Sequence, residues 1–386
     1  MNRLVTIVIN TVRGFSNPLF NFLIVIFGVR VFGKTDWASL INIMLWVFFI
    51  SFVLGWGNRD FLLRKYSQEP GKMYSAFFSN LISRSLLLPI SLILLLFYPI
   101  QIAFWAILLV VLIFCYSSLS TLVVYHQKFS AQLIAEIIGF VIILGSIFYL
   151  ETFELETFLT IYTLAITVKL CVLSLQLKFW KEPFTAKISI QEFKNGFPFF
   201  VLGFSGWLFS KIDIYVVDFY MEKSQLAEYQ LLITAFLMLQ ALAAYITIPF
   251  TKHVYRVSNK VLKKMKYKLY LAAFPLTLFG GFAIWFIMEY FVELGFSYKY
   301  YMVGCLIALP CYFYTINIME LIKNHKERII IYTSLIGLIV NITLIYFLIE
   351  SHEIFGVLLS VCITQWLVLI IYKTYLKTRT KNQFYL

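Results

Sequence analysis

Charged residues are scarce in this chain of 386 residues. Asp, Glu, Lys and Arg together make up 13% of the chain, whereas apolar residues make up 61% and the mean hydropathy is +0.85. Because soluble globular domains contain about 25% charged residues, this composition excludes that class. Cysteine is also rare, with five residues. All five lie inside apolar stretches without the spacing of a metal site, so we expect them to act as small apolar side chains.

Catalytic motifs are missing as well. The sequence contains no Walker loop, no GxSxG or HExxH motif and no dinucleotide-binding glycine pattern. The four histidines lie in the gaps between apolar stretches or at the ends of those stretches. We therefore predict that the protein is not an enzyme and that it holds no metal and no cofactor.

Long apolar runs fill the chain almost completely. A membrane-spanning helix needs about 20 mainly apolar residues, and the sequence has room for about twelve. The spacing predicts an all-α polytopic membrane protein. The predicted spans are residues 15–32, 37–57, 73–98, 101–125, 131–150, 157–177, 196–220, 226–250, 269–288, 301–321, 329–349 and 354–374.

Basic residues concentrate in every second gap between the spans. One side of the predicted membrane holds 25 of the 32 Lys and Arg residues, with the densest group in residues 252–268. The other side holds four and is acidic around Glu151–Glu156. Basic loops stay in the cytoplasm, so the protein is expected to have both termini inside. The net charge of +13 then indicates attraction to anionic membrane lipids, not binding of nucleic acid.

The spans divide evenly about the basic stretch 178–194. We predict two six-helix bundles, residues 1–181 and residues 182–386, around a central cavity. An even number of spans in each half would give a parallel repeat, a common plan in transporters.

Ionisable residues at membrane depth are costly and usually tied to function. Arg84 and Lys169 lie near the middle of the third and sixth spans, and Lys211 and Asp213 lie in the seventh. Two interpretations stay open: each is half of a buried ion pair, or together they line a polar cavity. Because these cations outnumber the acids, such a cavity would suit an anionic, phosphate-bearing substrate.

Polar and small residues form faces on two of these spans. In the seventh, Gly203, Gly206, Ser210 and Asp213 follow helical spacing, so a carboxylate ends a small-residue face. On a continuous helix Lys211 would lie about 200° from Asp213, so the two could not neutralise each other. In the third span, a polar face is formed by Asn80, Ser83, Arg84 and Ser91.

Four stretches resemble polysaccharide flippases of the MOP superfamily, of the Wzx or O-antigen transporter type. They are FLIVIFGVRVFGKTDWASL, with Arg30 and Gly33; LGWGNRDFLLRKYSQ; FKNGFPFFVLGFSGWLFSKIDIYVVDFYMEKSQLAEYQLLITAF, with Asp213; and SLIGLIVNITLIYFLIESHEIFGVLLSV, with Asn341 and Gly356. The resemblance covers nearly the whole chain.

The resemblance implies a MATE-like fold and a function in surface polysaccharide (O-antigen, capsule or lipopolysaccharide) biosynthesis. The protein would move undecaprenyl-diphosphate-linked oligosaccharide across the bacterial cytoplasmic (inner) membrane by alternating access. Arg30, Arg84, Lys169 and Lys211 would bind the diphosphate, and Asp213 would couple transport to H+ or Na+. Expected partners are the lipid-linked oligosaccharide, membrane lipids, and polysaccharide polymerase or ligase machinery.

Two other functions remain open. The first is export of drugs or small solutes by a member of the same superfamily, which would favour a net-anionic cavity. The second is a membrane-embedded polysaccharide polymerase, a class that usually carries a sizeable external loop. The short gaps on the acidic side leave no room for such a loop.

The charge bias makes a direct prediction about orientation. Single cysteines replacing Lys263 and Glu154 in a cysteine-free background should react oppositely with an impermeant thiol reagent. In intact cells, position 154 should be labelled and position 263 protected, because basic loops remain in the cytoplasm. Labelling of position 263 but not 154 would refute the orientation.

Overall fold

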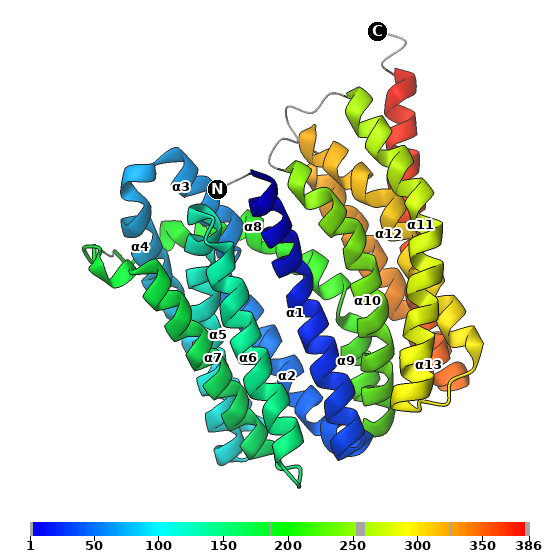
Figure 1. Ribbon diagram of the computed structural model, residues 1–386. Coiled ribbons are helices and arrows are strands. Elements are labelled where there is room, and N and C mark those ends of the chain that lie inside the picture. The colour runs from blue at the N-terminus through cyan, green and yellow to red at the C-terminus, as the bar shows by residue number, and fades with distance from the viewer. Residues whose placement is uncertain (1–2, 186, 252–258, 325, 383–386) are drawn as a thin grey trace. The chain divides into compact units, whose positions relative to one another are not determined.

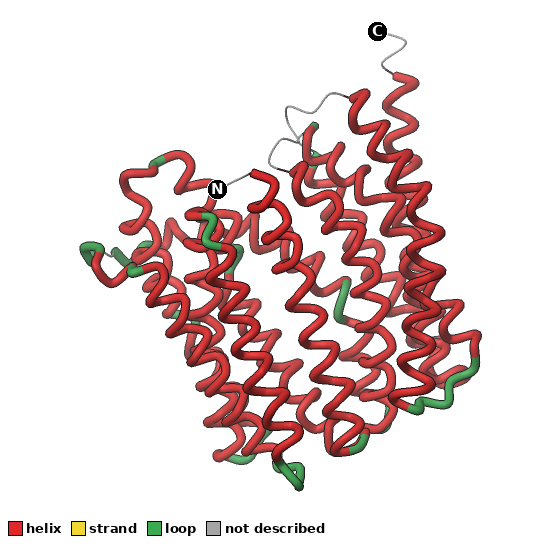
Figure 2. Tube along the Cα trace, viewed as in Figure 1, coloured by secondary structure: helices red, strands yellow, loops and turns green. Residues whose placement is uncertain are grey.

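The computed structural model describes residues 3–185, 187–251, 259–324 and 326–382, and every regular element in these ranges is helical (Figure 1, Figure 2). This confirms the all-α prediction. The basic residues Lys252 and Arg256 lie outside the described residues. The elements are α1 (Arg3–Phe32), α2 (Lys34–Gly55), α3 (Asn58–Gln68), η1 (Pro70–Lys72), α4 (Met73–Ser85), η2 (Leu88–Leu96), α5 (Ile100–His126), α6 (Phe129–Tyr149), α7 (Leu155–Leu177), η3 (Phe179–Lys181), α8 (Ile190–Phe209), α9 (Ile212–Tyr220), α10 (Lys223–Thr251), α11 (Asn259–Ile287), η5 (Met288–Val292), α12 (Tyr298–Lys323) and α13 (Glu327–Asn382).

The helices are long and apolar enough to make this a multi-pass membrane protein. Among the described residues, ten segments could cross a membrane, or eleven if the bent pair α8 and α9 is one span. One of the ten, Arg328–Leu376, is 49 residues long and is interrupted at Glu353, where the backbone is not helical. Since about 20 residues span a bilayer, this segment is long enough for two crossings. The total then agrees with the predicted twelve.

The chain divides into two compact units. Unit 1 comprises Met1–Phe204 and unit 2 comprises Ser205–Leu386, so α8 begins in one unit and ends in the other. The expected repeat boundary after residue 181 stays a prediction. Each unit has its own buried core.

In unit 1, α7 packs against both α5 and α6, while α1 packs on α6 and α2 packs on α5 (Figure 1). Trp37 at the start of α2 is 1% exposed and meets the ring of Phe158 edge-on, with ring centroids 5.6 Å apart. A second buried cluster gathers Leu62, Phe77 and Leu122 from α3, α4 and α5. At least two separate groups of buried apolar side chains therefore hold the helices of unit 1 together.

In unit 2, α12 packs against α10, α11 and α13, and α9 packs on α13. The interior includes Tyr312, whose hydroxyl donates a hydrogen bond to the Leu239 carbonyl at 2.8 Å. Large apolar side chains such as Phe279 and Phe347 are exposed, as expected of surfaces that face lipid.

Two predicted straight spans are broken. The third changes from α-helix to 3₁₀-helix after Ser85, next to Pro89, because proline lacks the backbone N–H and collides with the preceding turn. The seventh bends by 48° between α8 and α9, and Lys211 at the break has non-helical backbone angles. The small residues Gly206 and Ser210 precede this bend, and such residues accompany many kinks.

A tight turn joins α2 to α3, and the first half of α8 packs against this turn. Trp56 and Gly57 both have positive φ, at 43° and 66°. The Trp56 indole N–H donates to the Phe193 carbonyl at 3.1 Å, and the ring stacks on Phe200 with centroids 4.4 Å apart. A Cβ on Gly57 would lie 2.5 Å from the Phe200 backbone nitrogen, so glycine is required by both conformation and space.

Gly57→Ala should therefore destabilise unit 1. The left-handed conformation alone costs roughly 1–2 kcal/mol for alanine, and displacement of the α8 backbone adds to this. Gly71→Ala is the matched control, because a Cβ there meets open space. Thermal unfolding of the detergent-purified variants should show a clear loss for position 57 and little change for position 71. Equal stability of the two variants would contradict this packing.

Candidate functional site

Arg84 on α4 is 2% exposed and is held by two other helices of unit 1, α2 and α5. Its Nη1 donates to the carbonyls of Leu54 and Gly55, at 3.2 and 3.4 Å, and its Nη2 donates to the Ser118 hydroxyl at 2.8 Å. Leu54 and Gly55 end α2, where carbonyls lack partners within the helix and carry partial negative charge. The guanidinium thus caps α2 while joining it to α4 and α5.

The Arg84 contacts continue into a buried polar network. Arg84 Nε donates to Asn80 Oδ1 at 2.7 Å, and Asn80 Nδ2 donates to Glu192 Oε2 at 3.3 Å. The other oxygen of Glu192 pairs with the Lys65 ammonium at 2.5 Å. The network therefore links the Lys65–Glu192 ion pair, which joins α3 to α8, to the buried guanidinium group of Arg84. Ser83 and Ser91, from the predicted polar face of the third span, are buried as well.

Lys169 on α7 has a partner on the neighbouring helix α6. Its ammonium lies 2.6 Å from Glu136 Oε2, and the Tyr116 hydroxyl of α5 donates to Glu136 Oε1 at 2.6 Å. The side chains of Lys169 and Glu136 are 13% and 5% exposed. Gly139, one turn beyond Glu136, makes room for the Lys169 chain, since a Cβ there would collide with it. These contacts form a buried ion pair fixed by a third helix.

Arg84 and Lys169 occupy different sides of α5. Arg84 contacts Ser118, whereas the Lys169 pair contacts Tyr116, and these two positions lie about 200° apart around the helix. Both residues therefore have partners on neighbouring helices of unit 1. Of the two interpretations left open by the sequence, the buried ion pair describes Lys169. A role in substrate binding stays a prediction.

In unit 2, Asp213 lies in the first turn of α9, directly after the helix break, and is 3% exposed. The Tyr229 hydroxyl of α10 donates to Asp213 Oδ2. The other oxygen, Oδ1, is buried and has no hydrogen-bond partner among the residues that the structure describes. An unpaired buried oxygen is unfavourable, so this carboxyl group has an unfilled capacity for a proton or a cation.

Lys211 and Arg30 lie at helix ends. Lys211 is the half-buried residue that precedes α9, and its non-helical backbone makes the expected 200° separation from Asp213 inapplicable. Arg30 lies exposed in the last turn of α1, where a cation complements the negative end of the helix. Their proposed contacts with substrate stay predictions.

Sequence reasoning missed several members of these clusters. Glu192, Lys65, Tyr116 and Tyr229 were not singled out as site residues. Asn80 and Arg84 are four residues apart on one helix, which is the spacing of facing side chains. That spacing was the available signal for their contact.

The fold matches two solved transporter structures. The lipid II flippase MurJ, in its inward closed conformation, aligns with a TM-score of 0.74 and 15% sequence identity, over 96% of this chain and 87% of that chain. The eukaryotic MATE transporter AtDTX14 aligns with a TM-score of 0.67 and 14% identity, over 97% of this chain and 94% of that chain. This chain therefore shares its fold with these two transporters. No known family profile and no curated protein sequence matches it.

The Lys169–Glu136 pair should behave as a coupled unit. Lys169→Met leaves a buried carboxylate without its cation and should cost about 3–5 kcal/mol of stability. The double variant Glu136→Gln with Lys169→Met removes both charges and should recover most of that loss. Thermal unfolding in detergent measures both effects.

The exposed pair Lys72–Glu69 provides the matched control, because Lys72→Met should change stability by less than about 1 kcal/mol. A double variant as unstable as Lys169→Met alone would show that the two charges are not coupled.

Proposed function

We propose that this protein moves undecaprenyl-diphosphate-linked oligosaccharide across the bacterial cytoplasmic membrane by alternating access. The observation that carries the proposal is the likeness to the lipid II flippase MurJ, which extends over 96% of the chain. The basic-loop bias supports an orientation with both termini in the cytoplasm. The resemblance of four sequence stretches to polysaccharide flippases points to the same substrate class.

Lys211 and Arg30 are the proposed contacts with the diphosphate. A diphosphate in a low-dielectric environment requires cationic or N–H donors, and Lys and Arg both supply them. Arg84 and Lys169 would have to exchange their present partners before they could take this role. We therefore rank them behind the other two cations.

Asp213 is the proposed coupling residue. Its carboxyl group is buried at a helix break, and only one of its two oxygens accepts a hydrogen bond within the described residues. Such a group is suited to take up H+ or Na+ in one conformational state and to release it in another. Reversible loading of such a group would bias the equilibrium between two conformations by the difference in its affinity for the ion.

Export of small cationic solutes is the second candidate, favoured by the likeness to AtDTX14. A drug-sensitive strain expressing the chain separates the two functions, since only an exporter would raise drug tolerance. A non-enzymatic role is part of both proposals. We further propose that polymerase or ligase machinery uses the transported lipid-linked sugar.

Complementation tests the proposed function directly. A bacterial strain that lacks its own lipid-linked oligosaccharide flippase should regain surface glycan when it expresses this chain. In the same strain, Asp213→Asn should reach the membrane at normal levels but restore at most about a tenth of the surface glycan, because the neutral side chain cannot cycle a charge.

Asp218→Asn, the same substitution on the same helix, is the control and should retain function. Parent-level surface glycan with Asp213→Asn would remove Asp213 from coupling. No surface glycan with the parent chain, despite normal membrane levels, would count against the proposed substrate.

A further inference from the structure

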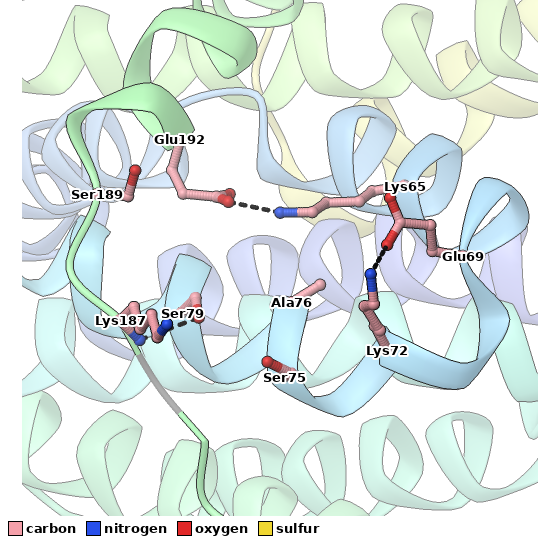
Figure 3. Close-up of a pocket in the computed structure, with 9 residues that line it drawn as sticks. All are labelled: Lys65, Glu69, Lys72, Ser75, Ala76, Ser79, Lys187, Ser189 and Glu192. Atoms are coloured by element: carbon pink, nitrogen blue, oxygen red, sulfur yellow. Dashed lines mark hydrogen bonds and ion pairs between the residues drawn. The ribbon is translucent and has the colours of Figure 1, made fainter.

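A pocket of about 250 Å³ lies in unit 1 between α3, the first turns of α4 and the segment that leads into α8. Figure 3 shows its lining side chains arranged around an open space. Hydrogen-bond donors dominate the lining: Lys65, Lys72, Lys187, Ser75, Ser79 and Ser189. The buried polar network of Arg84 adjoins the pocket through the Glu192–Lys65 pair.

The two carboxylates of the pocket are neutralised by lysines of the pocket. Glu192, whose side chain is 10% exposed, pairs with Lys65 at 2.5 Å. Glu69 pairs with Lys72 at 3.0 Å, but their side chains are 55% and 78% exposed. An exposed pair of this kind contributes little stability, so the Lys72 ammonium can turn to an incoming anion at small cost. Lys187 adds a third ammonium group, so the pocket carries a positive charge in excess.

Two serine hydroxyls of the pocket retain donor capacity. Ser79 Oγ accepts a hydrogen bond from the Lys187 backbone N–H at 3.1 Å, and Ser189 Oγ accepts one from the Gln191 backbone N–H at 3.2 Å. In accepting, each hydroxyl keeps its own O–H for donation. Ammonium groups and hydroxyl donors around one space recognise an anion with several acceptor oxygens, and a phosphate group has that chemistry.

The residues that line the pocket come from two of the basic gaps between the predicted spans and from the helices beside them. The α3–α4 connection and the segment 178–194 both lie on the side that the charge bias places in the cytoplasm. That side of the membrane presents anionic headgroups to juxtamembrane lysines and is also open to soluble phosphates. The volume is several times the roughly 30 Å³ that a water molecule occupies, so a phosphate fits with its waters.

We propose that this pocket binds a phosphate group at the cytoplasmic face, carried either by a membrane lipid headgroup or by a soluble phosphate compound. Lys72 and Lys187 hold the anion at the mouth, and Ser79 and Ser189 donate to it from the wall. Bound phosphate joins the α3–α4 connection to the start of α8. The proposal requires the pocket and the orientation, and it does not depend on the transported substrate.

The test measures phosphate binding to the purified full chain at about 0.15 M salt. Pyrophosphate is the soluble probe, and nanodiscs with phosphatidic acid, compared with nanodiscs of phosphatidylcholine alone, provide the headgroup. Saturable binding of pyrophosphate identifies a soluble source. Saturable binding only of phosphatidic acid identifies the headgroup. Saturable binding of neither probe overturns the proposal.

Variants then assign the binding to the pocket. The double variant Lys72→Gln with Lys187→Gln removes two exposed charges without touching the buried pair and should weaken binding at least about tenfold. Ser79→Ala should weaken it severalfold. Lys263→Gln, an exposed lysine of unit 2 on the same predicted side, is the matched control. Unchanged affinity in the double variant, or an equal loss with Lys263→Gln, would overturn the proposal. Complementation is scored separately, so the two proposals can fail independently.

Discussion

The exclusion of water from the hydrocarbon core is the constraint on which the rest of this structure depends. Each polar group at membrane depth must find a partner inside the protein. Arg84 does so by capping the last carbonyls of α2 and by bonding Asn80 and Ser118. Lys169 does so through Glu136 and Tyr116. Both arrangements join different helices of unit 1, so the charges that looked like ligands also hold the unit together.

Unit 2 contains the contrasting case. Asp213 is as deeply buried as Arg84, yet within the described part of the chain one of its oxygens has no hydrogen-bond partner. It lies beside the 48° bend between α8 and α9, where the helix pattern is interrupted. In membrane transporters, discontinuous helices place backbone and side-chain groups at substrate and ion sites. The unpaired oxygen of a buried acid at such a position is the observation behind the proposed coupling role of Asp213.

The span pattern and the helical class were predictable because they depend on hydropathy and length, which are local properties of the sequence. The break at Lys211 and the 3₁₀ segment after Ser85 were not predicted, although Ser210 and Pro89 lie beside them. The partners of Arg84 could not be predicted from the sequence for another reason. Two of them are backbone carbonyls at Leu54 and Gly55, which carry no residue-type signal. The pairing of Lys169 with Glu136 likewise depends on how α6 and α7 pack together, which is not a local property of the sequence.

Transbilayer movement in purified vesicles tests the central claim most directly. Vesicles containing a labelled undecaprenyl-diphosphate oligosaccharide in both leaflets are treated with an impermeant enzyme that removes the sugar. In vesicles without protein, about half of the label should remain protected. With the reconstituted chain, the account predicts that nearly all label becomes accessible over time, under conditions where a phosphatidylcholine probe stays protected. Persistence of the protected half at high protein content would contradict the account.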